Sequence, residues 1–261
     1  MIYSLTWLPL VFEEAGLKVA LVDGWASRGR GDMGSVMGTI CHHTAGPSLG
    51  NMPSLRTLID GRGDLPGPLA QLGLGRDGTF YVIAAGRCNH AGTGEWRGLT
   101  TGNSSFIGIE AENAGTQGDI PWPDVQMHCY KRGIAAILRY IGRGAEFCVG
   151  HKEYALPKGR KNDPLFDMDA FRAEVAALMT GPVPAPVLIP AAEPGGGRPT
   201  LRRAAFGDPV RTVQARCGVE ADGAFGALTE AAVRRFQRDQ KLVPDGIVGP
   251  RTWAALDAMG R

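Results

Sequence analysis

One stretch of the chain, TGPVPAPVLIPAAEPGGGRPT at residues 180–200, limits the possible folds more than any other. It is crowded with proline, alanine and glycine, so it has little apolar surface to bury and is expected to form a semi-extended linker. About 180 residues precede it and about 60 follow it, which suits one sizeable domain and one small one. We therefore predict a domain at residues 1–180, a linker at 181–198 and a second domain at 199–261.

The composition is ordinary for a soluble globular protein and argues against several other classes of protein. Hydrophobic residues make up 44% and charged residues 21%, and the net charge of +2 gives no reason to expect nucleic-acid binding. No apolar run reaches the roughly 18 residues of a membrane-spanning helix, so we expect no membrane insertion. Five irregularly spaced cysteines without a CxxC pair argue against a disulfide framework. The N-terminal region has no basic start, so we expect synthesis in the cytoplasm without a signal peptide.

Alternating strand and helix signals predict the fold class of the first domain. Short apolar runs bounded by glycine or aspartate indicate strands at residues 17–22, 36–43, 78–85 and 105–113. Apolar residues at helical spacing predict one helix over 123–142, and a second helix over 167–179 begins with an aspartate. Strands interleaved with helices indicate an α/β domain with a mixed central β-sheet flanked by helices.

The C-terminal part contains an internal repeat. DGAFGALTEAAV at 222–233 returns as DGIVGPRTWAAL at 245–256, an offset of 23 residues, and each copy predicts a short helix capped by Thr229 or Thr252. GDPVRTVQARCG at 207–218 predicts a third helix. Residues 198–261 carry eleven basic and seven acidic side chains, a net charge of +4, whereas residues 1–180 carry 17 and 18. We expect a small, basic, all-α three-helix module.

Three polar residues that follow short runs of the first domain can form a metal site. His42 closes the run VMGTIC, His151 follows EFCVG, and Asp163 follows the turn GRKN. Successive strand residues face opposite sides, so His42 and His43 cannot both point into one cleft, and Cys41 is expected to be buried on the other face. Two histidines and one carboxylate with an open fourth position form the ligand set of a catalytic zinc. By themselves, these residues leave packed core histidines as an alternative.

Four segments follow one another within roughly residues 33–172: TICHHTAG, LGLGRDGTFYVIAAGRCNHAG, SSFIGIEAENAG and VGHKEYALPKGRKNDP. In this order they closely resemble the zinc-dependent N-acetylmuramoyl-L-alanine amidases of the amidase-2 type, which include phage lysozyme-amidases and peptidoglycan recognition proteins. This resemblance implies that His42, His151 and Asp163 bind zinc and that Lys161 is the family's lysine two positions before the last ligand.

The same resemblance bears on proton transfer. Many members carry a tyrosine before the RDG turn, where this chain has Ala70, and members without it tend to have a glutamate at the position of Glu110. Amide hydrolysis needs a carboxylate that takes a proton from water and returns it to the leaving amine, and Glu110 at the end of a buried strand suits that role. Glu112 remains an alternative. Lys161 is the candidate for stabilising the oxyanion, while Arg160 is expected to support its turn.

Two further residues are candidates for substrate binding. His90 in CNHAG resembles a family position that lines the substrate groove, and a structural turn histidine is the alternative. Asn113 in AENAG can contact sugar or peptide, although loop residues of this kind also serve structural roles. His43 is expected to be a packed residue near the metal, not a ligand.

The C-terminal repeat closely resembles the three-helix peptidoglycan-binding module of wall hydrolases. The two resemblances together imply a monomeric zinc amidase that cuts the bond between N-acetylmuramic acid and L-alanine, with peptidoglycan as its partner. Without a signal peptide, release by membrane permeabilisation, as in phage endolysins, is the preferred interpretation for its action on the wall. The alternatives are a bacterial autolysin, a recycling amidase and a non-catalytic peptidoglycan receptor. The host, the stem-peptide type and the export route do not follow from the sequence.

Overall fold

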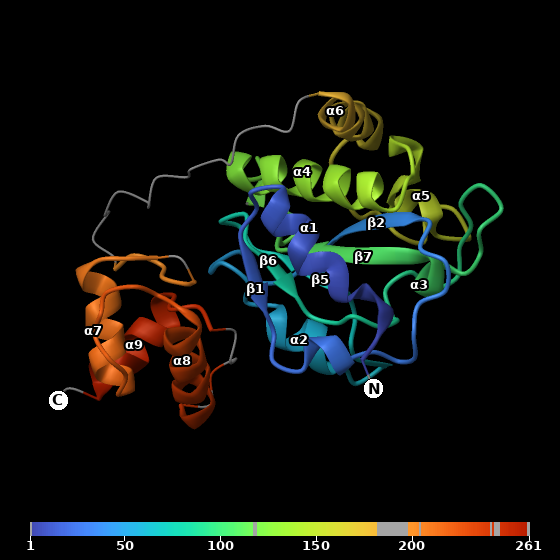
Figure 1. Cartoon of the computed structure of the whole chain (residues 1–261). Helices are drawn as coiled ribbons and strands as arrows, with labels where there is room; N and C mark the ends of the chain where they lie inside the picture. The colour runs from blue at the N-terminus through green and yellow to red at the C-terminus, as the bar shows by residue number, and fades with distance from the viewer. Residues whose placement is uncertain are drawn as a thin grey trace. The chain divides into compact units, whose positions relative to one another are not determined.

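The computed structural model describes residues 2–116, 119–181, 198–203, 205–240, 242 and 246–259. Contacts between residues divide the chain into two compact units, Met1–Val187 and Leu188–Arg261 (Figure 1). Residues 182–197, most of the expected linker, lie outside the described residues, so the linker bounds stay a prediction. Among the helices of the described part, none has the length and apolar character needed to cross a membrane.

The first unit is built on a mixed six-stranded sheet with the strand order β1-β6-β5-β7-β2-β8. Neighbouring strands are parallel except for the antiparallel pair β5–β6. The strands are β1 Val19–Leu21, β2 Gly38–His43, β5 Leu72–Leu74, β6 Phe80–Val82, β7 Phe106–Ala111 and β8 Cys148–Gly150, and β3 Gly61–Arg62 with β4 Leu65–Pro66 forms a separate hairpin. The predicted mixed α/β class is confirmed.

Helices pack on both faces of this sheet. Figure 1 shows α4 and α6 on one side of the sheet and α2 on the other. The helices are α1 Leu8–Glu14, α2 Leu55–Asp60, α3 Gly102–Ser105, α4 Asp124–Tyr140, α5 His151–Tyr154 and α6 Met168–Thr180, with short 3-10 turns at Ser4–Trp7, Trp25–Ser27 and Ala145–Phe147. The carboxylate of Asp167 accepts hydrogen bonds from two backbone amides of the first turn of α6, as its predicted aspartate start requires.

Because side chains alternate along a strand, the two faces of β2 and β7 have different surroundings. Cys41 and Ile109 pack in the main core with Ile134 of α4. Ile40 and Phe106 belong to a separate apolar cluster on the opposite face. Because side chains two residues apart share a face, the even-numbered residues of β2 and β7 project away from α4. Cys41 is fully buried, as the sequence predicts.

Tyr130 of α4 connects the main core to the strand that carries His42. Its ring is fully buried and makes edge contacts with Phe166 and Phe171. Its hydroxyl accepts a hydrogen bond from the backbone amide of His42 at 3.0 Å and donates to the carbonyl of Ile109 at 2.9 Å. One phenol therefore fixes β2 and β7 at the point where they pass the site.

The second unit is the expected three-helix module. Its helices are α7 Asp208–Cys217, α8 Ala227–Asp239 and α9 Pro250–Ala258, and its apolar core includes Val233, Phe236, Trp253 and Leu256. The expected threonine caps are wrong: Gly226 and Gly249 precede the helices, without a side-chain cap.

The two threonines instead belong to a hydrogen-bonded unit that occurs twice. Gln214 donates to Thr229 at 2.9 Å and accepts from the amide of Gly223 at 2.8 Å. Gln237, 23 residues later, makes the same contacts with Thr252 at 3.2 Å and with the amide of Gly246 at 2.8 Å. Both glycines have a left-handed φ, of 81° and 75°, which explains the repeated Asp-Gly pair.

Replacing Tyr130 by phenylalanine should lower the free energy of unfolding of the metal-free chain by about 1–3 kcal/mol, because the buried amide of His42 and carbonyl of Ile109 lose their partner. Chemical denaturation measures this change. Tyr140→Phe is the matched control, since Tyr140 is 55% exposed and its stacking on Trp7 survives the change. Equal stability of the two variants would show that the Tyr130 hydroxyl does not hold these strands.

Candidate metal centre

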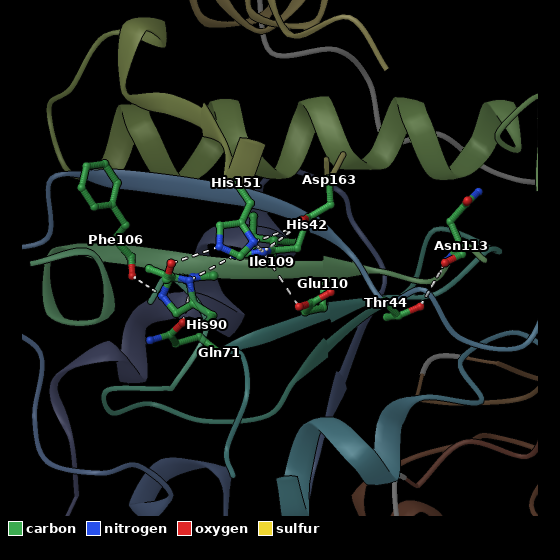
Figure 2. Close-up of polar contacts among 12 residues, drawn as sticks. His42, Thr44, Gln71, His90, Phe106, Ile109, Glu110, Asn113, His151 and Asp163 are labelled. Carbon is green, nitrogen blue, oxygen red and sulfur yellow. Dashed lines mark hydrogen bonds and ion pairs between the residues drawn. The ribbon is translucent and has the colours of Figure 1, made fainter. Parts of the chain in front are cut away.

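Three ligand atoms from separate segments converge beside the carboxyl ends of β2 and β8 (Figure 2). His42 Nδ1 lies 3.0 Å from His151 Nδ1 and 3.1 Å from Asp163 Oδ2, and the last two atoms are 3.0 Å apart. All three residues are buried. In the part of the chain that the structure describes, these residues form the group of His, Cys, Asp or Glu side chains that could hold a metal ion.

The sequence brings these groups together through strand pairing and two local contacts. Parallel pairing of β2 with β8 places the start of α5, and with it His151, beside the end of β2. The carbonyl of Asp163 accepts a hydrogen bond from the amide of Lys152 at 2.7 Å, which folds the loop back onto α5. Glu153 of α5 forms a bidentate ion pair with Arg172 of α6, with distances of 2.7 and 2.8 Å. This pair holds the short helix in position.

Neighbouring acceptors determine which nitrogen of each imidazole faces the centre. His151 Nε2 donates to the carbonyl of Ala91 at 3.0 Å, so its Nδ1 carries the free lone pair. His90 Nε2 donates to the carbonyl of Phe106 at 3.1 Å, so His90 Nδ1 accepts from His42 Nε2, also at 3.1 Å. The remaining lone pair of His42 is then on Nδ1, which faces the centre. Both rings have the tautomer that a metal ion requires.

The protonation of these groups also fits a cation site. The pKa of His42 is lowered to about 4, by burial first and then by the charge of His151, so the imidazole is neutral at neutral pH. Burial alone would raise the pKa of Asp163, but its close contacts with the rings of His151 and His42 bring it well below its usual range. Two neutral imidazoles and one carboxylate are therefore directed at one another. This donor set fits zinc in a site with an open position.

Glu110 is the cross-strand neighbour of His42. The two residues are register partners in the parallel pair β2–β7, and Glu110 Oε1 lies 3.9 Å from His42 Nδ1. The other carboxylate oxygen, Oε2, is buried and has no hydrogen-bond partner among the residues that the structure describes. Burial, followed by the negative charge of Asp163, raises the pKa of Glu110 to about 8. A carboxyl group that readily holds a proton thus lies beside the ligand atoms.

The surroundings of Glu112, the alternative carboxylate, indicate a structural role. It is fully buried, and its oxygens accept hydrogen bonds from the hydroxyl of Thr44 at 2.8 Å and from the amide and hydroxyl of Ser54, both at 2.9 Å. These bonds tie the end of β7 to the segments before α2. Because its acceptor capacity is used by the protein, the structure favours Glu110 over Glu112 for proton transfer.

Lys161 lies two residues before Asp163 and is half-buried. Its positive charge acts on both Glu110 and His42, whose pKa values it lowers. Within the described residues it forms no hydrogen bond or ion pair, so its ammonium is available. Arg160 donates instead to the carbonyls of Leu156 and Thr93, at 2.8 and 2.6 Å, as expected of a residue that supports the turn.

The two candidate substrate-binding residues have structural partners. His90 is 8% exposed and both of its ring nitrogens bond to the protein, so the structure favours a role in orienting His42. The side chain of Asn113 is fully buried, donates to the carbonyl of Asp119 at 2.9 Å and accepts from the amide of Gly115 at 2.8 Å. Both side chains bond to the protein, and a substrate-binding role stays a prediction for both.

Sequence reasoning did not identify the supports of the site. Tyr130, the carbonyl of Ala91 and the Glu153–Arg172 ion pair all act through residues distant in sequence. Their signal in the sequence is weak, because a backbone acceptor leaves no mark in the sequence and a buried tyrosine at helical spacing resembles any core residue.

The comparisons with known proteins cover both units. Residues 32–165 match the Amidase_2 model, N-acetylmuramoyl-L-alanine amidase, and residues 207–256 match the PG_binding_1 model, "Putative peptidoglycan binding domain". A curated relative, the "Uncharacterized protein in bpoA1 3'region" of Kitasatospora aureofaciens, is 47% identical over 66 residues, which is 23% of this chain and 56% of that protein. The chain thus spans little more than half the length of this relative.

Several solved structures show partial similarity. A selenomethionine derivative of AmpD has 22% identity and a TM-score of 0.46, and the match covers 67% of this chain and 99% of that one. The N-acetylmuramyl-L-alanine amidase AmiD from E. coli has 19% identity and a TM-score of 0.45, with coverages of 88% and 91%. The endolysin of the Thermus scotoductus bacteriophage Ph2119 has 16% identity and a TM-score of 0.46, with coverages of 61% and 99%.

The assignment to a family rests on the sequence match. The amidase model spans residues 32–165, which is more than half of the 261 residues and includes the whole His-His-Asp centre. This chain belongs to the N-acetylmuramoyl-L-alanine amidase family.

Proposed function

We propose that the chain is a zinc-dependent hydrolase that cleaves the amide bond between N-acetylmuramic acid and L-alanine in bacterial peptidoglycan. The observation that carries this proposal is the convergence of His42, His151 and Asp163, with the unpartnered oxygen of Glu110 beside them. The family to which the chain belongs supports the choice of bond. The ligand set, Glu110 and Lys161 are all present, which supports an active enzyme over a receptor without activity.

Zinc is the metal that best fits the donor set. Two imidazole nitrogens with fixed tautomers and one carboxylate oxygen provide three ligands, which leaves a fourth position for water or substrate. A bound zinc ion supplies a nucleophile at neutral pH, because it lowers the pKa of water to about 7.

Residues of the chain carry out the proton transfers and stabilise the developing charge. Glu110 takes the proton released by the attacking water and transfers it to the nitrogen of the leaving L-alanine. Its oxygen Oε2, which has no hydrogen-bond partner among the described residues, can hold the proton between these two transfers. The ammonium of Lys161 stabilises the negative charge that develops on the former carbonyl oxygen. His90 acts indirectly, by holding His42 in the tautomer that leaves Nδ1 free.

The second unit supports action on the intact cell wall. Its match to a peptidoglycan-binding model suggests that it anchors the enzyme to the polymer, which a recycling amidase acting on soluble fragments would not need. We therefore assign residues 1–180 to catalysis, 181–198 to the linker and 199–261 to wall binding. Lysis of a bacterial wall by a monomer, in the manner of an endolysin, is the role that this combination favours, without insertion into a membrane or binding of nucleic acid.

Removal of either histidine ligand should abolish stoichiometric zinc binding. His42→Ala and His151→Ala should each retain well below one zinc per chain after dialysis, as measured by elemental analysis, because two ligands cannot hold the ion tightly. His43→Ala is the matched control, since His43 adjoins His42 on β2 but lies near the ring of Trp122 and outside the ligand group. Full zinc occupancy in both ligand variants would refute the site.

Glu110→Gln should keep its fold and its zinc but lose turnover of a soluble muropeptide by about 10²-fold or more, because the amide cannot accept the proton. Glu112→Gln should chiefly lower stability through its contacts with Thr44 and Ser54. The roles are reversed if folded, zinc-loaded Glu112→Gln is inactive while Glu110→Gln is close to wild type.

The raised pKa of Glu110 gives a second readout that does not depend on activity. Between the usual pKa of 4.5 and the folded-state value of about 8, the folded metal-free chain binds this proton more tightly than the unfolded chain does. Each rise in pH through this window therefore favours unfolding. Glu110→Gln should remove this part of the pH dependence, as measured by denaturation of metal-free protein between pH 5 and pH 8.

A chain that ends near residue 181 should hydrolyse soluble muropeptides normally but lose activity on intact sacculi. The apolar cores of the two units are separate, so the first should fold without the second. Tethering to a solid substrate can raise apparent affinity by roughly 10²-fold without new contacts at the active site. Parallel assays on muropeptide and sacculi test this, with sedimentation of fragment 198–261 as the direct binding assay. Unchanged lysis by the shortened chain would exclude an anchoring role.

A further inference from the structure

The second unit contains a groove beside the first copy of its repeat. The groove has a volume of about 490 Å³ and is lined by residues of α7, α8 and the segment between them. Of its lining residues, Gln214 and Thr229 are buried, whereas Leu228 is 82% exposed. The exposed lining residues are called the edge of the groove. Its volume lies in the range of pockets that bind small ligands or short peptide segments.

The two copies of the repeat share their framework but differ in the residues at the edge of this groove. Gln214, Gly223 and Thr229 return 23 residues later as Gln237, Gly246 and Thr252, and they make the same contacts in both copies. Some exposed lining residues also return, such as Ala231 as Ala254, but three of them do not.

Three edge positions of the first copy carry groups that the second copy lacks. Glu220, Leu228 and Arg235 correspond in sequence to Val243, Arg251 and Ala258. The hydrogen-bonded framework accounts for the turn and helix of each copy without these three side chains. All three are exposed, so the core does not explain them either. Their chemistry is therefore available for a ligand.

The edge residues present two opposite charges and one apolar surface. The guanidinium of Arg235 donates to the carbonyl of Cys217 at 3.2 Å, which holds it at the groove and leaves further N–H groups for an anion. Glu220 makes no ion pair with any described residue. Leu228 offers an exposed apolar surface, and Ala231 adds a small side chain next to it.

We propose that this groove is the wall-binding site of the module and that it recognises the stem peptide of peptidoglycan, not the glycan strand. A stem peptide carries carboxylates for Arg235, an ammonium on its diamino residue for Glu220, and alanine methyl groups for Leu228. None of the described residues that line the groove is aromatic, so it offers no ring on which a sugar could stack. This inference rests on the proposed function, because it names the part of the polymer that the second unit binds.

The test measures sedimentation of the full-length chain with purified sacculi, with Glu110→Gln added to every variant so that the wall is not digested. Arg235→Glu should weaken binding about tenfold, because charge reversal replaces attraction to a carboxylate by repulsion. Leu228→Asn should weaken it without any change of charge. Arg251→Glu is the matched control: it makes the same charge change on an exposed residue of α9, outside the groove, and should bind like the parent.

Competition identifies the ligand. The soluble tripeptide L-Ala-γ-D-Glu-diaminopimelate should displace the parent chain from sacculi, while the peptide-free glycan chitotetraose should not. Displacement by the glycan alone, or equal binding by Arg235→Glu and Arg251→Glu, would overturn the proposal. If a chain ending at residue 181 sediments as well as the full chain, wall anchoring by the second unit is wrong, and the groove proposal is wrong with it.

Discussion

The parallel pairing of β2 with both β7 and β8 is the constraint on which the whole site depends. It places His42 directly opposite Glu110 and brings the end of β8, where His151 begins α5, to the same edge of the sheet. Because strand side chains alternate, a register shift of one residue would turn His42 or Glu110 into the core beneath α4. The chemistry of the centre is therefore encoded in the same pattern of apolar residues that builds the sheet.

Buried polar contacts then fix the positions of the strands and imidazole rings that this register brings together. Tyr130 bonds to the backbone of β2 and β7, His90 orients His42, and the carbonyl of Ala91 orients His151. Loss of any one partner would leave a buried polar group unsatisfied, which costs about 1–3 kcal/mol. The ligand atoms are consequently held in place by the fold, so little ordering remains to be done when a metal binds.

The sequence predicts the main elements of both units well, and its failures have local causes. The longer strands and helices have a clear apolar period, whereas β5, Leu72–Leu74, has three residues and is too short to show one. Thr229 and Thr252 have the residue type of a helix cap, but Gln214 and Gln237 bind them. A buried side-chain amide that hydrogen-bonds to a turn outside its own helix produces no periodic pattern in the sequence.

The candidate site could be predicted from the sequence to a similar degree. The positions of His42, His151 and Asp163 after short apolar runs suggest that they meet, but only strand order and register bring their ligand atoms within about 3 Å of one another. Sequence reasoning leaves Glu110 and Glu112 as alternatives, and the hydrogen bonds of Glu112 to Thr44 and Ser54 favour Glu110.

The central claim concerns the bond that is cut, and mass spectrometry of the products tests it most directly. Purified sacculi digested by the zinc-loaded chain should release peptides with free L-alanine amino ends and leave glycan strands whose N-acetylmuramic acid carries a free lactyl carboxylate. The reducing ends of the glycan should not increase. New reducing sugar ends, with peptides still attached to N-acetylmuramic acid, would contradict the account.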